Sequence, residues 1–295
     1  MNHSKAIDNE LHLPRLERQS FEPRALKSII LSSITIFASI AACIPLFSVL
    51  IMLLYRGGKR LSLELFYGLP PTAFETGGGF GNAIVGTLFM VGLAALISIP
   101  FGILAAIFMA ELGPDSKISI AARFCAKIMT GLPSILAGVF AYAAVVKTMG
   151  SYSAWAGGVA LSLLMIPVVL LTAEEALKMV PKAMKEAASG MGCTPAQAML
   201  KVILPVAMPG IITGVVLAVA RAAGETAPLL FTALFSDYWL NAQQPTASLA
   251  VLIYNYSGMP FDNQIELAWA ASLVLVLMVF LLNIISRTLG GRKKI

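Results

Sequence analysis

Stretches of about 20 apolar residues without a charged side chain recur along this sequence, and they restrict what the chain can fold into. A helix of that length crosses the hydrocarbon core of a bilayer, and no segment shows the alternating apolar period of a membrane β-barrel. We therefore expect an all-α integral membrane protein with six transmembrane helices. The windows cover residues 29–54, 83–109, 132–146, 157–171, 210–234 and 267–289.

The composition agrees with a membrane protein. Hydrophobic residues make up 58% of the chain and charged residues only 12%, whereas soluble domains contain about 25% charged residues. The net charge of +6 could indicate nucleic acid as a partner. The positive residues lie beside the apolar windows, however, which is the pattern that orients membrane proteins. We therefore expect membrane lipid as the surroundings and no nucleic-acid partner.

The placement of Lys and Arg predicts the orientation of the chain, because cytoplasmic loops carry the excess of these residues. Both tails and the loops after the second and fourth windows are rich in them, whereas the last loop on the other side, 235–266, contains none. Both termini are therefore predicted to be cytoplasmic. The first apolar run starts too late and is too long for a cleaved signal peptide. We expect a tail at 1–28, a first helix at 29–54, a transmembrane core at 80–289 that includes the polar segment 181–205, and a tail at 290–295.

Several enzyme classes lack their chemical groups in this sequence. The two histidines, His3 and His12, lie in the N-terminal tail, and every aspartate falls outside the apolar windows, so an intramembrane hydrolase has no catalytic groups. The run "RGGKR" at 56–60 lacks the upstream glycine and the Ser or Thr after lysine that bind nucleotide and Mg²⁺. We expect no metal site and no cofactor in this chain, and any energy from ATP must come from another chain.

The polar segment "PKAMKEAASGMGCTPAQAMLKVILP", residues 181–205, separates the fourth and fifth windows and predicts two short helices joined by a turn. Pro181 suits a first helical position, and Gly192 can take the left-handed conformation that ends a helix. Thr194 and Gln197 have the spacing of a capping box, and Pro205 is expected to close the second helix. An amphipathic hairpin lying on lipid is the alternative. Four residues share one apolar face: Val180, Met184, Ala187 and Met191.

The same segment resembles the coupling loop "EAA…G…I-x-LP" of bacterial ABC importer permeases. Matching residues are Glu186, Ala187, Ala188, Gly192, Leu204 and Pro205, and Val202 stands where isoleucine is usual. In that family the loop forms a pair of helices that docks in a groove of the cytoplasmic ATPase. The resemblance implies the type I importer (MetI-like) permease fold, with coupling helices between spans four and five.

Further stretches resemble the A-type permease subunit of the phosphate-specific importer, and the likeness covers nearly the whole chain after about Leu63. They are "ARAAGETAPLLFTALF", "GLPSILAGVFAY", "LAWAASLVL" and "FETGGGFGNA". The resemblance implies a transport subunit rather than an enzyme, in the bacterial inner membrane. It also implies a related second permease subunit, two copies of an ATPase that binds ATP and Mg²⁺, and an external phosphate-binding protein.

A cation and an anion, Arg221 and Glu225, interrupt the fifth apolar window in "RAAGETAPLL". A charge in a span costs roughly 2.5–3.5 kcal/mol, so such residues normally face the protein interior or water. On a continuous helix the spacing of four lets the two side chains meet near the middle of the span, and Pro228 weakens the helix there. We expect Arg221 to bind phosphate oxygens while Glu225 holds Arg221 when the path is empty. A mutually neutralised pair that only braces the helix is the alternative.

Two hydroxyl residues are weaker candidates for the substrate pathway. Thr226 follows the glutamate, and Ser134 lies in "GLPSI", where a bond to its own helix is the simpler interpretation. The sequence thus favours the permease of an ATP-driven phosphate importer. A permease for another oxyanion or small solute shares the coupling loop and is the nearer rival, and a membrane enzyme or scaffold is the more distant one.

Overall fold

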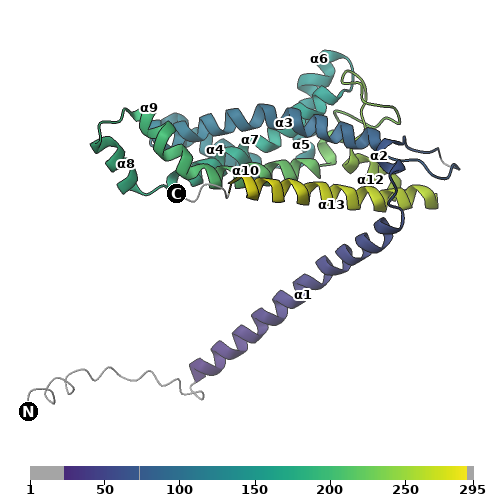
Figure 1. Ribbon diagram of the computed structural model, residues 1–295, viewed down its shortest axis with the longest axis horizontal. Helices are drawn as coiled ribbons and strands as arrows, with labels where there is room; N and C mark the ends of the chain where they lie inside the picture. The colour runs from purple at the N-terminus through teal and green to yellow at the C-terminus, as the bar shows by residue number, and fades with distance from the viewer. Residues whose placement is uncertain (1–22, 73, 291–295) are drawn as a thin grey trace, which may run out of the picture. The chain divides into compact units, whose positions relative to one another are not determined.

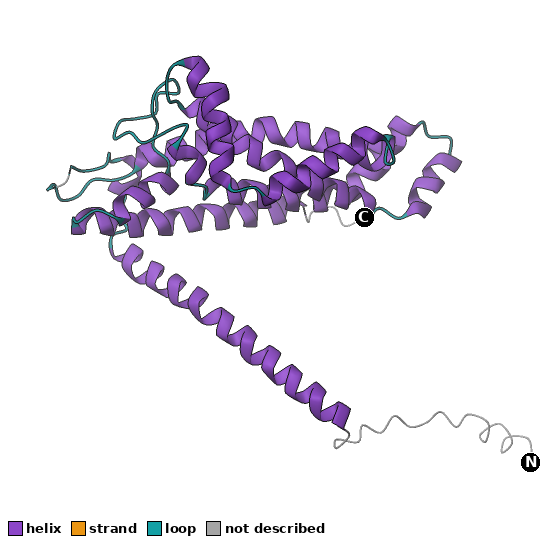
Figure 2. Ribbon diagram, turned by 180° about the vertical axis from the view of Figure 1, so that it is seen from behind, coloured by secondary structure: helices purple, strands orange, loops and turns teal. Residues whose placement is uncertain are grey.

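Helices make up all the regular structure that the computed structural model describes, which covers residues 23–72 and 74–290 (Figures 1 and 2). The chain divides into two compact units, Met1–Met52 and Leu53–Ile295. The expected tails, 1–28 and 290–295, lie outside the described residues except for 23–28 and 290. The elements before the fourth window are α1 (Pro23–Lys59), α2 (Glu64–Tyr67), α3 (Gly81–Ile107), η1 (Phe108–Leu112), α4 (Lys117–Gly131), α5 (Ser134–Ala141), η2 (Tyr142–Val146) and α6 (Lys147–Met149).

The second half of the chain begins with the long helix α7 (Ala154–Lys178). Within the described residues five helices are long and apolar enough to cross a membrane, or six if a bent pair counts as one span. This confirms the all-α membrane fold, and the expected six spans are reached when the bent pair is counted as one of them. The elements after α7 are α8 (Lys182–Gly190), α9 (Pro195–Ala198), η3 (Met199–Ile203), α10 (Leu204–Ala223), α11 (Ala227–Leu230), α12 (Leu249–Ser257) and α13 (Asp262–Gly290).

The third apolar window, 132–146, is not one straight span. Helices α4 and α5 meet at a bend of 107°, where Leu132 and Pro133 have extended backbone with ψ of 143° and 131°. The residue before a proline is pushed out of the helical region, so the bend follows from Pro133. The segment before it, expected to be a loop carrying Lys117, Arg123 and Lys127, is the helix α4.

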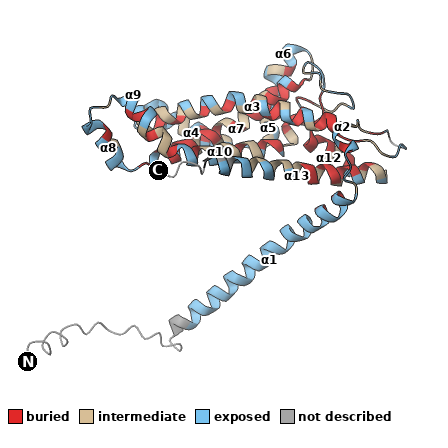
Figure 3. Ribbon diagram, viewed as in Figure 1, coloured by how far each residue is buried: buried red, intermediate tan, exposed pale blue. Residues whose placement is uncertain are grey.

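Helix α7 is the centre of the second unit and packs against α3, α4, α5 and α10. Of its apolar stretch 67% is buried, against 28% for α3 and for α13, and Figure 3 shows buried residues along it. Alanine, glycine and serine on its buried faces let neighbouring helices approach closely, as is common in membrane bundles. The Ser98 hydroxyl of α3 also donates a hydrogen bond to the Ser162 carbonyl, at 3.1 Å.

The last loop on the side opposite the coupling segment, 235–266, contains a buried helix that the sequence did not indicate. Helix α12 packs on α3 and α13 and buries Leu249 and Leu252 completely. Its first amide, on Leu249, donates to the Thr87 hydroxyl of α3 at 2.9 Å, and the Ser248 hydroxyl accepts from the Val251 amide. Figure 1 places α2, α6 and α12 at one end of the unit and α8 and α9 at the other.

The backbone preceding α12 lies directly against α3 at Gly86. A β-carbon at this glycine would lie 2.0 Å from the Ala247 carbonyl oxygen, a contact that no side chain can make. Another glycine of the same helix, Gly92, has open space around it. The two positions therefore provide a substitution at a close contact, Gly86, and a matched control, Gly92.

We expect Gly86→Ala to lower the stability of the protein by about 1–3 kcal/mol, because a backbone carbonyl cannot move aside as a flexible side chain can. Gly92→Ala should leave stability unchanged or slightly raised, since alanine favours a helix. The measurement is the apparent melting temperature of the two variants purified in detergent. Equal melting temperatures would show that the segment before α12 is not held against α3.

Candidate functional site

The fifth span breaks at the charged residues. Helix α10 ends at Ala223 with Gly224 as its C-cap, and the chain resumes helical structure only in the single turn α11. Pro228, in that turn, has no amide to continue the ladder of hydrogen bonds. The weakening expected from Pro228 is therefore confirmed as a break. The expected boundaries, 210–234, are wrong, because the helix that forms the span runs from Pro195 to Ala223.

Arg221 and Glu225 form an ion pair across this break. The Arg221 Nε lies 3.4 Å from Glu225 Oε1, and the two side chains are 50% and 16% exposed. The expectation that both lie midway along one continuous helix is wrong, since Arg221 is in the last turn of α10 and Glu225 lies beyond its end. A cation suits this position, because the last carbonyls of a helix carry partial negative charge.

The two hydroxyl candidates lie at the starts of short helices. Thr226 is the N-cap residue of α11 but makes no side-chain cap bond, and Ser134 is the first residue of α5, directly after the bend at Pro133. Helices α5 and α11 are in contact: a β-carbon on Gly138 would lie 2.6 Å from the α-carbon of Pro228. The structure thus brings the two broken spans together at this point.

The coupling segment forms two short helices, as expected. Pro181 is the N-cap residue of α8 rather than its first helical residue. Gly192 has φ of +79°, and the amides of Gly192 and Cys193 donate to the carbonyls of Ser189 and Ala188, which is a Schellman ending. Thr194 and Gln197 form the predicted capping box.

The expected end of the second coupling helix at Pro205 is wrong. From α9 the chain continues through the π-helical turn η3 into α10, so Leu204 and Pro205 lie in the first turn of α10. Pro205 has no amide to donate to the preceding turn, and the regular α-helical pattern is interrupted directly before it by the π-helical turn. The coupling segment and the fifth span are consequently one continuous helical path.

Helix α8 divides into an inward and an outward face. Ala188 is buried and Lys185 half-buried, whereas Glu186, Ala187 and Met184 are exposed. Of the four residues expected to share an apolar face, only Val180 is buried, and Met191 is 76% exposed. Exposed apolar residues on such a segment are typical of a surface that contacts another protein or a membrane.

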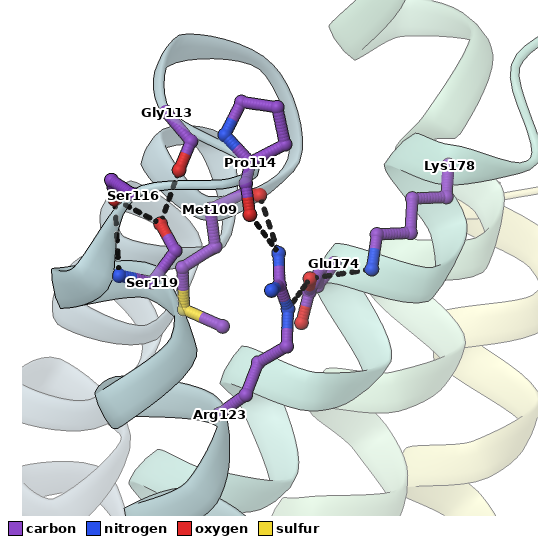
Figure 4. A network of polar contacts seen from close by, with 8 residues as sticks. All are labelled: Met109, Gly113, Pro114, Ser116, Ser119, Arg123, Glu174 and Lys178. Atoms are coloured by element: carbon purple, nitrogen blue, oxygen red, sulfur yellow. Dashed lines mark hydrogen bonds and ion pairs between the residues drawn. The ribbon is translucent and has the colours of Figure 1, made fainter.

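A network of polar contacts that the sequence analysis missed lies near the same end of the molecule (Figure 4). Glu174 of α7 is buried, and its Oε1 accepts from Arg123 Nε at 2.5 Å and from Lys178 Nζ at 2.6 Å. Arg123 of α4 also donates to the carbonyls of Met109 and Pro114, at 2.8 and 3.2 Å. A buried carboxylate is thus paired twice, and one guanidinium joins α4, α7 and the segment after α3.

A signal for part of this network was present in the sequence. The pair Glu174 and Lys178 has the i, i+4 spacing of a helical ion pair at the polar end of an apolar run. Arg123 is far away in the sequence and lay in a segment expected to be a loop. Its contact with Glu174 depends on the packing of α4 against α7, which local patterns do not reveal.

Comparison with known proteins gives close relatives. The sequence profile of the family described as binding-protein-dependent transport system inner membrane component matches residues 98–294. The phosphate transport system permease protein PstA of Haemophilus influenzae is 42% identical over 83% of this chain and 87% of its own length. A probable phosphate transport system permease protein PstA of Methanocaldococcus jannaschii is 40% identical over 88% of this chain and 91% of its own length.

Solved structures share the fold. A chain of the inward-facing MetNI methionine ABC transporter aligns with a TM-score of 0.57 at 22% identity, covering 71% of this chain and 92% of its own. A chain of a bacterial alginate ABC transporter, solved with an alginate-loaded periplasmic protein, aligns with a TM-score of 0.63 at 17% identity, covering 92% and 99%. These likenesses confirm the MetI-like permease fold.

The buried carboxylate gives a prediction about stability. Glu174→Gln should lower the stability of the protein by roughly 3 kcal/mol, because it leaves the Arg123 charge half-buried without its carboxylate. Lys178→Gln should cost less than about 1 kcal/mol, since Lys178 is largely exposed. Arg123→Gln combined with Glu174→Gln should recover much of the loss. Melting temperatures in detergent measure all three, and an equal loss in the Lys178 variant would contradict the expected ranking.

Proposed function

Since the chain belongs to the family of binding-protein-dependent transport system inner membrane components, we propose that it is the membrane permease subunit of an ATP-driven phosphate importer. The observation that carries the proposal is the 42% identity to a phosphate transport permease over 83% of the chain. The chain is a multi-pass membrane protein and a transport component rather than an enzyme.

The proposed complex lies in the bacterial inner membrane and has four further chains. A related second permease subunit forms the path together with this chain, two copies of an ATPase bind ATP and Mg²⁺ on the cytoplasmic side, and a phosphate-binding protein delivers the substrate from outside. The family description, which names binding-protein-dependent systems, supports the last of these partners.

In this proposal the outward face of α8 is the surface that the ATPase covers. Glu186, Ala187 and Met191 are exposed in the isolated chain, although a proline and a Schellman turn hold the loop in a defined shape. A helix of this kind suits docking in a groove. Because α9 continues through η3 into α10, closure of the ATPases would move the fifth span directly and so switch access between the two sides.

The ion pair supports a role for Arg221 in the substrate path. Its contact with Glu225 is a single one of 3.4 Å from Nε, and half of the Arg221 side chain is exposed. Neither terminal nitrogen of the guanidinium makes a hydrogen bond within residues 23–72 and 74–290. A planar fork with free donors suits two oxygens of a phosphate, and Glu225 supplies a resting partner.

The orientation follows from the charge asymmetry and gives the third prediction. Fused reporters at the N-terminus and at the C-terminus should both lie in the cytoplasm, whereas a reporter inserted near Asn241 should lie outside. The structure supports this arrangement, since α8 and α12 lie at opposite ends of the second unit (Figure 1). Reporter enzymes that are active on only one side of the membrane provide the measurement. Activity of the Asn241 fusion in the cytoplasm would overturn the topology.

The fourth prediction tests the function and the role of the pair together. Radiolabelled phosphate should enter liposomes that contain the complex, with added binding protein, and excess sulfate should not compete. Arg221→Lys keeps the charge but loses the planar two-point contact, so uptake per assembled complex should fall while assembly changes little. Uptake that sulfate suppresses as well as phosphate does would favour the permease of another oxyanion instead.

A double variant distinguishes a substrate-binding role of the ion pair from a purely structural one. Arg221→Gln with Glu225→Gln removes both charges, and replacing both members of a pair is often neutral for stability, whereas breaking a buried pair costs roughly 3–5 kcal/mol. We expect the double variant to assemble and to transport poorly. If the double variant takes up phosphate at the wild-type rate per assembled complex, the pair has only a structural role and does not bind the substrate.

A further inference from the structure

We propose that Lys185 and Glu111 form the contact through which the coupling helix α8 moves the second span, in addition to the fifth span into which the coupling segment continues. The proposal rests on the proposed function, because it assigns a route for motion that starts at the ATPase. Lys185 and Glu111 are positioning residues that act through the helices they join, and neither is placed in the substrate path.

The ion pair joins two segments that are distant in the sequence. Lys185 lies on the inward face of α8, and its Nζ donates to the Glu111 carboxylate in the π-helical turn η1 that ends α3. Both side chains are mostly covered, with exposed fractions of 26% and 16%. The pair is therefore shielded from solvent more than an ordinary surface pair, and screening by salt weakens it less.

Apart from this ion pair, the inward face of α8 makes few contacts with the rest of the helical bundle. Helix α8 packs on α9 and η3, which belong to the coupling segment itself and its continuation. Ala188 is the buried residue of the helix, and the neighbouring outward residues are exposed. Among the described residues Lys185 is thus the side chain of α8 that reaches an element before α7 by an ion pair.

Glu111 lies in a short segment that also makes contacts on its other side. Arg123 donates to the carbonyls of Met109 and Pro114, which flank Glu111 by two and three residues, and pairs with Glu174 of α7. Motion of α8 transmitted to Glu111 therefore reaches α3 along the chain and α4 and α7 through Arg123. The segment from Met109 to Pro114 therefore connects the Lys185–Glu111 pair with the Arg123–Glu174 pair.

Two features make this segment suitable for relaying motion. The turn η1 is π-helical, and such turns are locally less regular than the α-helix that they interrupt. The contacts at its two sides, the ion pair with Lys185 and the hydrogen bonds from Arg123 to two carbonyls, are directional and can hold one arrangement or break, as an element with two discrete states requires. A purely apolar contact of α8 with the bundle would slide instead.

The test measures phosphate uptake and ATP hydrolysis together, in liposomes with the complete complex and binding protein. Glu111→Gln and Lys185→Met should retain ATP hydrolysis while phosphate carried per ATP falls by about two- to thirty-fold, the range found for mutations along coupling networks. The reversal Glu111→Lys with Lys185→Glu should recover most of the ratio. Asp115→Asn and Lys127→Met make the same charge changes at exposed positions nearby and should leave the ratio unchanged.

An unchanged ratio in both single variants, or no recovery in the reversal, would overturn the proposal. A loss of assembled complex with a normal ratio would show that the pair is only a brace, which also rejects it. The reversal keeps the test informative if a single variant fails to fold. Because all these ratios require phosphate transport by the wild-type complex, a second readout has to be independent of the substrate.

Spin labels at Ser189→Cys on α8 and Leu104→Cys on α3 provide that readout, in a background where Cys43, Cys125 and Cys193 are serine. The distance between the labels should stay the same in the nucleotide-free and the vanadate-trapped complex, because the pair moves the two helices together. In Lys185→Met it should shift or broaden. If the distance between the labels changes as much in the wild type as in the variant, the proposal is overturned, whether or not the complex carries phosphate. A wild-type complex that carries no phosphate would reject only the proposed function.

Discussion

An unpaired backbone amide or carbonyl is so costly in hydrocarbon that a chain can break a helix there only where other protein surfaces shelter the break. The chain breaks two of its spans, after Gly131 and after Ala223. Helices α5 and α11, which follow the two breaks, lie against each other where Gly138 meets Pro228. The elements that follow the two breaks thus pack on each other, whereas Leu132, Pro133 and Gly224 at the breaks themselves are exposed in the isolated chain. At the second break Arg221 lies in the last turn of α10 and Glu225 lies beyond its end.

Much of the fold could be read from local patterns. The apolar windows predict α3, α7 and α13, and the charge-bearing segment between spans four and five predicts its own caps: the box at Thr194 and the left-handed Gly192. These features depend on residues close in sequence. The bend at Pro133 also has a local cause, but a window that counts apolar residues averages across it.

The remaining features depend on packing. Leu249 could be identified as buried only once Thr87 had been placed beside it, because nine residues of helix carry no span-length signal. The contact between Arg123 and Glu174 needs α4 to lie on α7. At the candidate site the sequence identified the charged pair but placed it within an unbroken helix, since a proline four residues beyond a glycine weakens a helix without determining where it ends.

The buried helix α12 has a consequence for how the molecule is made. Membrane helices enter the bilayer in order as the chain is synthesised, and α12 is too short to be inserted as a span in its own right. Its partners are α3, synthesised long before it, and α13, synthesised after it. The end of the protein that contains α12 can therefore be completed only after the last helix has left the ribosome, and chains truncated within α13 would present an unfinished surface there to quality-control proteases.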